Sequence, residues 1–517
     1  MAAIAQGSVV AVIGSGAMGS GIAQVAAVAG YQVKLFDMRP EAVSKAIADI
    51  GAVFGKLVEK GKMSAADADA ARARLRGVSG LGDVADAALV VEAVAENLDV
   101  KRSLFGDLEG IVADDAILAT NTSSISVTAI AAKLRRPQRL AGMHFFNPVP
   151  LMALVEVVSG LATDPAVAQT VYDTAAAWGK SPVHAKSTPG FIVNRVARPY
   201  YAEAWRLLNE QAADAATIDA VMREAGGFRM GPFELMDLIG HDVNFSVTQS
   251  VFSAYYNDPR FTPSVLQQEM VNAGFLGRKS GRGFYQYGEG AAAPQPKAEA
   301  PQPKPEYIGY SIEPGMSGKL TEPMVERLRA RGIAVTNRKS AEGHSHAEEP
   351  AFHCNGAAIY LTDGRTATQR AADNRHADTI VYDLVFDAGS SPRIAIAAAE
   401  QCNPRAVDAA VGMFQAAGFT VTRLDDVPGL AVMRTVAMLA NEAADAVHQG
   451  VCSAAAADIA MQKGVNYPRG PLAWADMVGM KHLVKVLDNM AQAYGEDRYR
   501  VSPLLRRKQA SGVKFHA

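Results

Sequence analysis

The sequence is poor in cysteine and has no long apolar run. Its three cysteines, Cys354, Cys402 and Cys452, include no C-x-x-C pair. This pattern excludes a disulfide framework and indicates a reducing compartment, so we expect a cytoplasmic protein. Glycine or charged residues interrupt the apolar segments well before the roughly 20 residues that a bilayer span requires. We therefore expect no membrane partner.

The sequence also has no large excess of positive or of negative charge. Lys and Arg number 51 and Asp and Glu number 53, so the net charge of −2 gives no general reason to expect nucleic acid as a partner. The first residues, "MAAIAQGSVVAVIGSG", contain no basic segment, so we expect no secretory leader. A chain of 517 residues is too long for one hydrophobic core, and we expect roughly two to four domains.

A glycine-rich turn is the first strong motif. Gly14, Gly16 and Gly19 form the pattern G-x-G-x-x-G between a run of Val and Ile residues and a segment of small residues. In a strand–turn–helix unit the first glycine makes the tight turn, the second lets a pyrophosphate approach the backbone, and the third lets the helix pack on the strand. The N-terminus of the helix adds partial positive charge. The motif predicts a dinucleotide-binding α/β domain.

The next predicted strand, "YQVKLFD", ends in Asp37. A carboxylate in that position accepts hydrogen bonds from the ribose hydroxyls of NAD and repels the 2′-phosphate of NADP. A solvated aspartate at a strand end is the alternative interpretation, and the neighbouring Arg39 weakens the argument against NADP. Because the glycine motif and the acidic strand end occur together, we predict NAD as the cofactor.

Further predicted strands alternate with helical segments, which indicates a parallel sheet covered on both faces. These strands lie in "AALVVEAVAEN", "AILATNTSSIS" and "RLAGMHFF". Ligands of such sheets bind beyond the carboxyl ends of the strands. Glu96, Asn121, Ser123 and His144 lie near those ends, which makes them candidates for a functional site.

An amphipathic helix is expected over residues 41–62. Its apolar stripe consists of Val43, Ile47, Ile50, Phe54, Leu57 and Val58. Lys56, Lys60 and Lys62 lie at its end. Two interpretations stay open: the lysines form a solvated face, or they contact the phosphates of an anionic substrate.

The segment "GMHFFNPVPLMALVEVV" (142–158) places two easily ionised residues, His144 and Glu156, in apolar surroundings. Pro148 and Pro150 predict a chain reversal. The histidine and the glutamate are equally distant from residue 150, so two antiparallel strands would place them opposite each other, about 5 Å apart. The carboxylate would then hold one ring nitrogen, and the other nitrogen could act as a general base. A purely structural polar contact is the alternative.

Several segments resemble, in order, the signatures of the L-3-hydroxyacyl-CoA dehydrogenases. They are "GSGAMGSGIA", "VVEAVAENLDVK", "TNTSSIS", "HFFNPVPLMALVEVV", "STPGFIVNRV", "MGPFELMDLIG" and "GRKSGRGFYQY", which together cover residues 8–287. The resemblance implies a Rossmann-like N-terminal domain and an all-α domain, like that of 6-phosphogluconate dehydrogenase, that closes the cleft and helps form a homodimer. It also implies NAD-dependent oxidation of acyl-CoA substrates, as in the β-oxidation of fatty acids.

The resemblance further implies roles for individual residues. His144 matches the catalytic base of the family and Glu156 its carboxylate partner, while Ser123 and Asn194 match the side chains that hold the oxygen atoms of the substrate. The positions that match nucleotide contacts are Gly14, Gly16, Met18, Gly19, Asp37, Glu96, Lys101, Ser123 and Asn147. Lys56 and Lys60 lie where the family meets coenzyme A. No metal is expected.

The second half of the chain repeats part of the first. "STPGFIVNRVARPYYAEAW" (187–205) corresponds to "DVPGLAVMRTVAMLANEAA" (426–444), at an offset of 428 − 189 = 239 between two prolines. The same offset pairs Glu203 with Glu442, Asp219 with Asp458, Met222 with Met461, Gly231 with Gly470, Pro232 with Pro471, Asp237 with Asp476 and Gly240 with Gly479. It also pairs His144 with Asp383, Glu156 with Ala395 and Asn194 with Met433. We therefore expect an internal repeat without a second active site.

These patterns divide the chain into a series of domains. We expect a NAD-binding Rossmann-like domain (1–186), a helical substrate and dimerisation domain (187–287), an unpacked Pro/Ala linker (288–307), a truncated Rossmann-like remnant (308–425) and a second helical domain that repeats 187–275 (426–517). This long form resembles the two-copy bacterial 3-hydroxybutyryl-CoA and 3-hydroxyadipyl-CoA dehydrogenases associated with phenylacetate degradation. The second copy is expected to cover, within one chain, the face that the first helical domain otherwise buries against a partner.

The segment "GHSHAEEPAFHC" (343–354) has three histidines and a cysteine, but their spacing matches no tetrahedral metal site, so we expect a surface loop. Two rival functions stay open. A β-hydroxyacid dehydrogenase that acts on free acids shares the nucleotide fold but resembles a lysine-based catalytic design. A NAD-binding structural protein would need none of the four residues implied in catalysis. An assay with acetoacetyl-CoA and NADH separates these alternatives.

Overall fold

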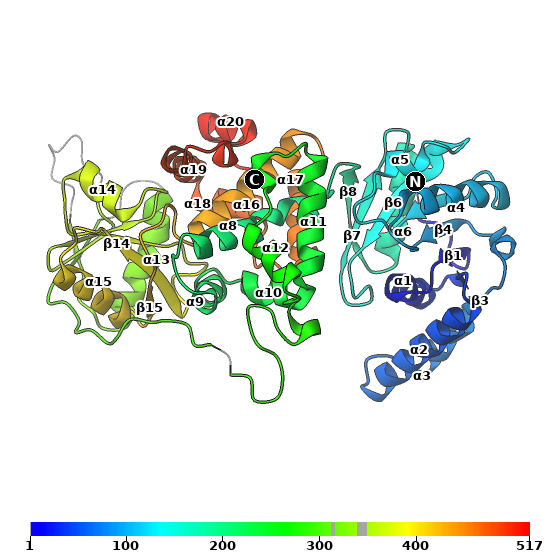
Figure 1. Cartoon of the computed structure of the whole chain (residues 1–517), viewed down its shortest axis with the longest axis horizontal. Coiled ribbons are helices and arrows are strands. Elements are labelled where there is room, and N and C mark those ends of the chain that lie inside the picture. Colours follow the sequence, from blue (N-terminus) through cyan, green and yellow to red (C-terminus); the bar gives the residue numbers. More distant parts are fainter. Residues whose placement is uncertain (1, 293, 312–315, 339–348, 517) are drawn as a thin grey trace. The chain divides into compact units, whose positions relative to one another are not determined.

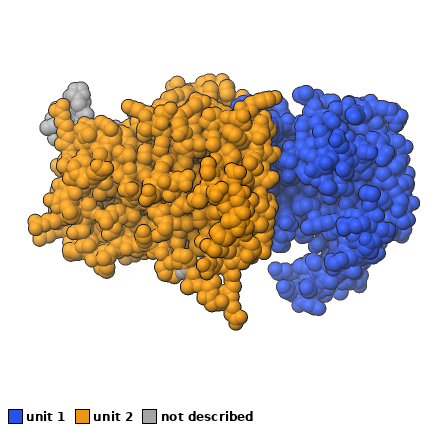
Figure 2. Space-filling view, in the orientation of Figure 1, with its two compact units in different colours: residues 1–195, 449–465 blue, residues 196–448, 466–517 orange. Residues whose placement is uncertain are grey.

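The computed structural model describes residues 2–292, 294–311, 316–338 and 349–516. These residues form two β-sheets, each with its own set of helices (Figure 1). The chain divides into two compact units, the first made of residues 1–195 and 449–465 and the second of residues 196–448 and 466–517 (Figure 2). None of the helices in the described part of the chain is both long and apolar enough to cross a membrane.

The sheet of the first unit has the strand order β3-β2-β1-β4-β5-β6-β7-β8. Its strands are β1 (Val9–Ile13), β2 (Gln32–Phe36), β3 (Leu75–Gly77), β4 (Leu89–Glu92), β5 (Ile117–Thr120), β6 (Leu140–Phe145), β7 (Leu154–Ser159) and β8 (Ser181–Lys186). Neighbouring strands from β3 to β6 run parallel, β7 is antiparallel to β6, and β8 is parallel to β7. The first six strands have the order of a dinucleotide-binding fold, so the predicted Rossmann-like domain is confirmed.

Amphipathic helices pack on this sheet. They are α1 (Ala17–Val28), α2 (Pro40–Glu59), α3 (Ala65–Ala73), α4 (Leu98–Ile111), α5 (Val127–Ala131), α6 (Pro165–Ala177) and α17 (Ala454–Gly464), with short turns η1 (Leu81–Val84) and η2 (Pro137–Arg139). On α2 the side chains of Val43, Ile50 and Phe54 are buried, and Ile47 and Leu57 pack partly buried against the same core. The predicted apolar stripe is therefore confirmed.

The sheet of the second unit has the order β10-β9-β11-β12-β13-β14-β15. Its strands are β9 (Ile308–Tyr310), β10 (Thr336–Asn337), β11 (Phe352–Cys354), β12 (Ala357–Leu361), β13 (Thr379–Tyr382), β14 (Arg393–Ala398) and β15 (Thr420–Arg423). As in β6, β7 and β8, β13 and β14 are antiparallel and β14 and β15 are parallel. Adding 239 to the bounds of β7 and α6 gives those of β14 and of α15 (Pro404–Ala416). The predicted Rossmann-like remnant is therefore confirmed.

The remaining helices come mostly from the two helical copies. They are α8 (Arg198–Asn209), α9 (Ala215–Ala220), α10 (Pro232–Ile239), α11 (His241–Ala254), α12 (Val265–Asn272), α13 (Met316–Ala330), α14 (Ala367–Asn374), α16 (Val432–His448), α18 (Pro471–Val478), α19 (Met480–Tyr494) and α20 (Pro503–Ser511). Shorter turns are η3 (Val221–Ala225), η4 (Pro259–Phe261), η5 (Arg278–Ser280) and η6 (Asp497–Tyr499).

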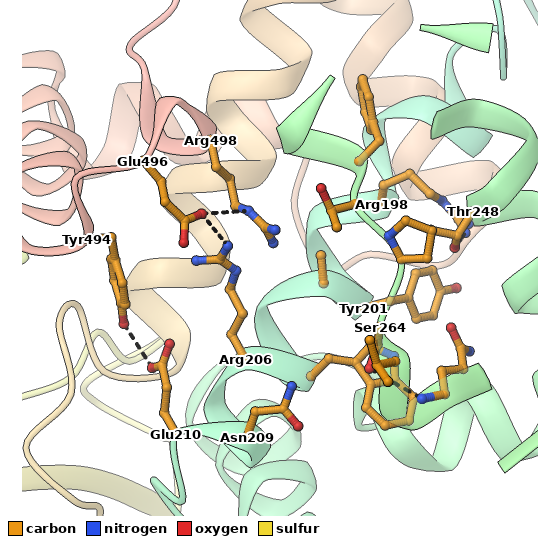
Figure 3. Close-up of a pocket in the computed structure, with 17 residues that line it drawn as sticks. Arg198, Tyr201, Arg206, Asn209, Glu210, Thr248, Ser264, Tyr494, Glu496 and Arg498 are labelled. Carbon is orange, nitrogen blue, oxygen red and sulfur yellow. Dashed lines mark hydrogen bonds and ion pairs between the residues drawn. The ribbon is translucent and has the colours of Figure 1, made fainter. Parts of the chain in front are cut away.

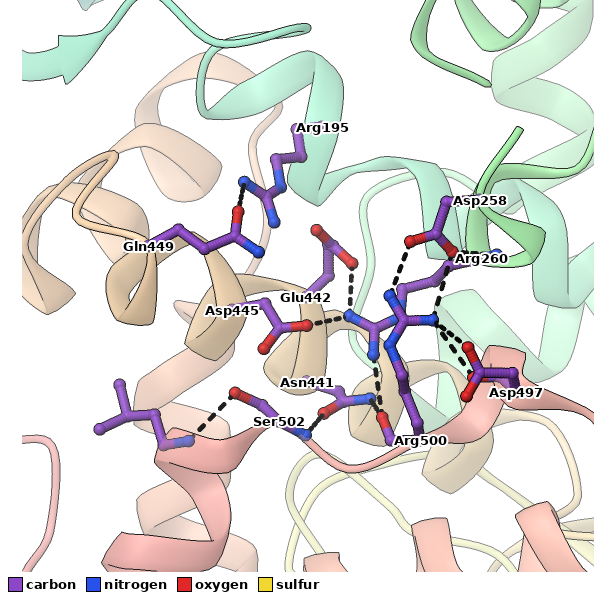
Figure 4. A network of polar contacts seen from close by, with 11 residues as sticks. Arg195, Asp258, Arg260, Asn441, Glu442, Asp445, Gln449, Asp497, Arg500 and Ser502 are labelled. Carbon is purple, nitrogen blue, oxygen red and sulfur yellow. Dashed lines mark hydrogen bonds and ion pairs between the residues drawn. The ribbon is translucent and has the colours of Figure 1, made fainter. Parts of the chain in front are cut away.

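The two helical copies pack on each other within one chain, as the repeat suggests. Helix α8 lies against its repeat counterpart α16, where Arg434 Nε and Glu203 Oε2 form a buried ion pair of 2.6 Å. Arg260 forms a second buried ion pair with Glu442, at 3.0 Å, and also pairs with Asp445 (Figure 4). These paired charges join the first helical copy to the second.

Each sheet is also in contact with a segment from the helical domain of the other copy. In the first unit α17 packs on β7 and β8, and a Cβ atom added to Gly464 would lie 2.6 Å from Leu154 Cδ2. In the second unit η3 packs on β14, where Arg393 Nε pairs with Glu224 Oε2 at 2.9 Å. Residues 449–465, which the repeat assigns to the second helical copy, therefore group with the first unit.

Two expectations about weakly patterned segments are wrong. The linker packs on the second unit: Glu299 N donates to Val421 O at 2.8 Å, because the outer edge of β15 presents backbone groups with which an extended segment can pair. The segment 343–354 is not a surface loop throughout, because Phe352 and Cys354 are buried in β11. Residues 343–348 of that segment lie outside the described residues.

Candidate active site

The glycine-rich turn has the geometry that its motif predicts. Gly14 has a φ of +106°, and a Cβ there would lie 2.5 Å from Ala93 O, while a Cβ on Gly19 would lie 1.8 Å from Gly14 O. Both positions therefore require glycine. Gly16 is the extended N-cap of α1 without a side-chain cap, and a Cβ on it would meet no protein atom within 4 Å. The N-terminus of α1 thus has room for a pyrophosphate.

Asp37 lies directly after β2, beside this turn. Its carboxylate accepts hydrogen bonds from Ser15 N and Ser15 Oγ, both at 2.9 Å, and from Arg39 N at 3.1 Å. Burial acts to raise the pKa of Asp37, but these hydrogen bonds and the charge of Arg39 outweigh it and hold the pKa below its ordinary value. Asp37 is therefore an oriented anion at the strand end where a dinucleotide ribose binds. Met18 is half-buried against the core, and Asn147 is exposed.

A buried ion pair lies at the end of β4. Lys101 Nζ is 2.6 Å from Glu92 Oε1 and 3.3 Å from Glu96 Oε2, and only 1% of the Lys101 side chain is exposed. Glu96 also accepts hydrogen bonds from Thr122 Oγ1 at 2.7 Å and from Ser123 N at 3.0 Å. Burial acts to raise the pKa of Glu96, but these hydrogen bonds and the charge of Lys101 hold it below its ordinary value. Lys101 thus orients Glu96, and Glu96 orients the loop that contains Ser123.

His144 and Glu156 are direct partners across the β6–β7 hairpin, which confirms the predicted pairing. They face each other in the strand register, and His144 Nδ1 lies 2.6 Å from Glu156 Oε2. His144 is 4% exposed, Glu156 is fully buried, and the rings of Phe146 and Phe191 flank the imidazole. Because Nδ1 donates to the carboxylate, the neutral ring has its lone pair on Nε2. Within the described chain no hydrogen bond occupies Nε2.

The second oxygen of Glu156 anchors the segment that follows β8. Glu156 Oε1 accepts hydrogen bonds from Ile192 N at 2.9 Å and from Val193 N at 3.0 Å. These groups open the short helix α7 (Val193–Val196), after a turn in which Gly190 and Phe191 have φ values of +74° and +46°. A left-handed φ is unfavourable for Phe, and the two hydrogen bonds to the carboxylate offset that strain.

Six of the predicted site residues are therefore neighbours within the first unit. Asn194 follows the anchored N–H groups, and its Nδ2 atom lies 3.5 Å from Ser123 O. Contacts or chain adjacency link, in order, Lys101, Glu96, Ser123, Asn194, Glu156 and His144. Lys56 and Lys60 are exposed at the end of α2 and contact none of these described residues.

Glu92 and two aromatic rings also belong to this group of side chains, although they were not predicted from the sequence. Glu92 is the last residue of β4, so the signal used for Asp37, an acidic strand end, identifies it as well. Phe146 and Phe191 have no such signal, because an apolar side chain beside a histidine is equally typical of a core. Within the described residues no group of three or more His, Cys, Asp or Glu side chains is placed to hold a metal ion.

A Rossmann-like sheet with room for a dinucleotide, and with a carboxylate-bound imidazole near its strand ends, defines the class of NAD-dependent oxidoreductases. Known protein families match in the same places. Residues 9–188 match the NAD binding domain of 3-hydroxyacyl-CoA dehydrogenase, and residues 190–287 and 429–514 both match its C-terminal domain. Residues 359–428 match the reduced Rossmann-fold domain of 3-hydroxybutyryl-CoA dehydrogenase.

Relatives match over nearly the full chain. It is 44% identical to the 3-hydroxyadipyl-CoA dehydrogenase of Escherichia coli K12 over 96% of this chain and 97% of the relative. The crystal structure of 3-hydroxybutyryl-CoA dehydrogenase from E. coli K12 superposes with a TM-score of 0.87 at 42% identity, over 98% of this chain and all of the other. The crystal structure of (S)-3-hydroxybutyryl-CoA dehydrogenase from Ralstonia eutropha superposes with a TM-score of 0.53 at 40% identity. This match covers 54% of this chain and 99% of the R. eutropha chain. The chain belongs to the 3-hydroxyacyl-CoA dehydrogenase family.

Proposed function

We propose that this protein oxidises (S)-3-hydroxyacyl-CoA to 3-oxoacyl-CoA with NAD as the acceptor. The observation that supports this most directly is the 2.6 Å contact between His144 Nδ1 and Glu156 Oε2, in a domain whose turn and strand end fit NAD. Gly16 and the N-terminus of α1 would hold the pyrophosphate, and Asp37 would hold the ribose. Bound NAD supplies the nicotinamide C4 that accepts the hydride from C3 of the substrate.

His144 is the proposed general base. Glu156 binds Nδ1, so Nε2 presents its lone pair and takes the proton of the C3 hydroxyl; in the reverse direction the imidazolium returns a proton to the forming alkoxide. The charge of Glu156, 2.6 Å away, stabilises the imidazolium. Ile192 N and Val193 N keep that carboxylate oriented. A positioned general base contributes about 100-fold to 10,000-fold to the rate.

Ser123 and Asn194 are the proposed ligands of the substrate's oxygen atoms. Both side chains are half-buried, and a hydroxyl and a carboxamide can donate hydrogen bonds to a developing alkoxide. Their contribution is positioning together with electrostatic stabilisation. The ammonium of Lys101 is buried and does not itself contact the substrate. It orients Glu96, which in turn positions Ser123. Glu96 and Asn147 are the proposed further contacts to the nucleotide.

A short acyl group, 3-hydroxybutyryl or 3-hydroxyadipyl, is the proposed substrate. Support comes from the names of the two E. coli proteins that match this chain over nearly its full length. The second of these acyl groups carries a terminal carboxylate and would suit a role in phenylacetate degradation. Lys56 and Lys60 are exposed and provide local positive charge for the phosphates of coenzyme A.

Steady-state kinetics of the full-length protein test the proposal. The substrates are the (S)-3-hydroxy thioesters of butyryl-, hexanoyl-, octanoyl- and adipyl-CoA, with free 3-hydroxybutyrate as the test of the rival β-hydroxyacid class. We expect the highest kcat/KM for the butyryl or the adipyl thioester, about tenfold or more above the octanoyl thioester. Free 3-hydroxybutyrate should not turn over. Equal turnover of acid and thioester would contradict the proposal.

A cytoplasmic homodimer completes the proposal. The support for a reducing compartment is that Cys354, Cys402 and Cys452 are all free thiols. Support for a dimer comes from the family resemblance. Because α16 already covers α8, a dimer would use another face. Analytical ultracentrifugation tests this: a dimer sediments with twice the 54.6 kDa mass of the chain, and a monomer at all concentrations would contradict it.

A further inference from the structure

The second unit contains a pocket of about 290 Å³ between the first helical copy and the segment that joins α19 to η6 (Figure 3). Aromatic rings form much of its wall: Tyr201, Trp205, Phe261 and Tyr494. Ligand pockets usually measure about 300 to 1,000 Å³, so this one fits a small molecule and is too small for coenzyme A. The site proposed for the dehydrogenase reaction lies in the first unit and shares no residue with it.

Arg198 lines this pocket as a buried cation without an anion. It is 5% exposed, its guanidinium lies 4.9 Å from the centroid of the Tyr201 ring, and its Nη1 donates to Thr248 Oγ1 at 2.9 Å. Its Nε atom has no hydrogen-bond partner, and in the described chain Arg198 forms no ion pair with a carboxylate within 4.0 Å. A buried charge without a partner destabilises a fold strongly. A bound anion would supply the missing partner.

The other arginines at this pocket differ from Arg198. Arg206 Nη2 pairs with Glu496 Oε2 at 2.7 Å, and Arg498 Nε lies 3.7 Å from the same carboxylate. Figure 3 shows these three residues as one group, with Arg198 apart from them beside Thr248. Each of these two arginines therefore has a carboxylate within 4.0 Å, whereas Arg198 has none in the described chain.

Two of the residues that line the pocket are replaced in the second copy. The repeat offset of 239 places Ala437 at the position of Arg198 and Ala444 at that of Trp205, and both alanines are fully buried. The cation and the large ring of the first copy are thus replaced by two alanine methyl groups in the second copy. Arg198 is therefore not a structural feature that the two helical copies share.

We propose that this pocket binds a small organic carboxylate through Arg198. One guanidinium with a neighbouring hydroxyl, that of Thr248, suits a singly charged carboxylate. Glu210 pairs with Arg434 and Glu496 pairs with Arg206, so neither carboxylate of the pocket competes for the guanidinium of Arg198. The aromatic wall accommodates a short carbon chain. The inference does not depend on the proposed dehydrogenase function.

Isothermal titration calorimetry of the full-length protein tests this site. The probes are sodium butyrate, sodium adipate and inorganic phosphate, each against a sodium chloride control of equal ionic strength. Arg198→Met is compared with Arg229→Met, which removes an exposed arginine from the same unit. We expect saturable binding of butyrate to the wild type and to Arg229→Met, weaker binding of the doubly charged adipate, and butyrate binding at least about tenfold weaker in Arg198→Met.

In the calorimetry, three outcomes would overturn the proposal: no saturable carboxylate binding, equal binding in Arg198→Met, or saturable binding of phosphate alone. Thermal unfolding adds a separate readout. Loss of an unpaired buried cation should raise the melting temperature of the ligand-free protein, and a lower one would show that Arg198 is already satisfied, which also overturns the proposal. Thr248→Val is an independent second binding variant. It should weaken carboxylate binding, and unchanged binding would count against the site.

Discussion

Glu156 and Asp383 perform the same structural task in the two copies of the fold. Glu156 accepts hydrogen bonds from the N–H groups of residues 192–193, and Asp383 accepts them from residues 431–433, in the repeat of that segment. Asp383 occupies the repeat position of the histidine, and Ala395 that of Glu156. The second copy has thus kept the anchored turn with a single carboxylate and has lost the imidazole.

Asp383 should make the stability of the second unit depend on pH. Burial raises the pKa of Asp383 from 3.8 to about 6, although its backbone hydrogen bonds oppose this. Because the folded pKa is the higher one, the stabilisation is complete below about pH 3.8 and is lost as the pH rises through about 6. The whole effect is roughly 3 kcal/mol at about 1.4 kcal/mol per pH unit. Urea unfolding of Asp383→Asn between pH 4 and 7 should therefore show a smaller decline than the wild type.

The matched control is Asp408→Asn, which changes an exposed aspartate on α15 of the same unit. Its decline in unfolding free energy with pH should equal that of the wild type. If Asp383→Asn declines as steeply as both, the buried carboxylate is not the titrating group.

Two glycines of the dinucleotide turn should respond in opposite ways to alanine. A Cβ on Gly16 meets no protein atom within 4 Å, so Gly16→Ala should keep the melting temperature and weaken NADH binding about tenfold or more. A Cβ on Gly19 would lie 1.8 Å from Gly14 O, so Gly19→Ala should destabilise the first unit by about 2 kcal/mol or more. Thermal unfolding and NADH fluorescence measure the two effects. Wild-type NADH affinity in Gly16→Ala would remove the turn from the cofactor site.

Asp37 should set the preference for NADH over NADPH. Its carboxylate is held anionic by Ser15 and Arg39, and it repels a 2′-phosphate. Asp37→Ala should lower the ratio of kcat/KM for NADH to that for NADPH by about tenfold or more. Asp49→Ala, which changes an exposed aspartate on α2, should leave the ratio unchanged. A constant ratio in Asp37→Ala would assign the discrimination to another group.

Local patterns explain why much of the first unit could be predicted from the sequence. The glycine turn and Asp37 depend on spacing within one strand–turn–helix unit. The contact between His144 and Glu156 follows from a chain reversal at Pro148 and Pro150 and from the alternation of side chains along strands. In each case the residues that decide the geometry lie close together in the chain.

Long-range contacts explain what could not be predicted. The packing of α17 on β7 and the pairing of the linker with β15 join segments that are distant in sequence and have no pattern of their own. The sequence also did not predict the turn of the second copy that Asp383 anchors. Gly429 and Leu430, with φ values of +76° and +53°, copy the turn at Gly190 and Phe191, but only coordinates reveal that Asp383 binds it.

Reduction of acetoacetyl-CoA by NADH, measured with the wild type and with His144→Gln, tests the central claim most directly. The control is His184→Gln, which changes an exposed histidine on β8 of the same sheet. We predict that His144→Gln keeps NADH affinity and lowers kcat by about 100-fold or more, while the control keeps wild-type turnover. Wild-type turnover in His144→Gln would contradict the account, because the imidazole held by Glu156 would then have no part in the reaction.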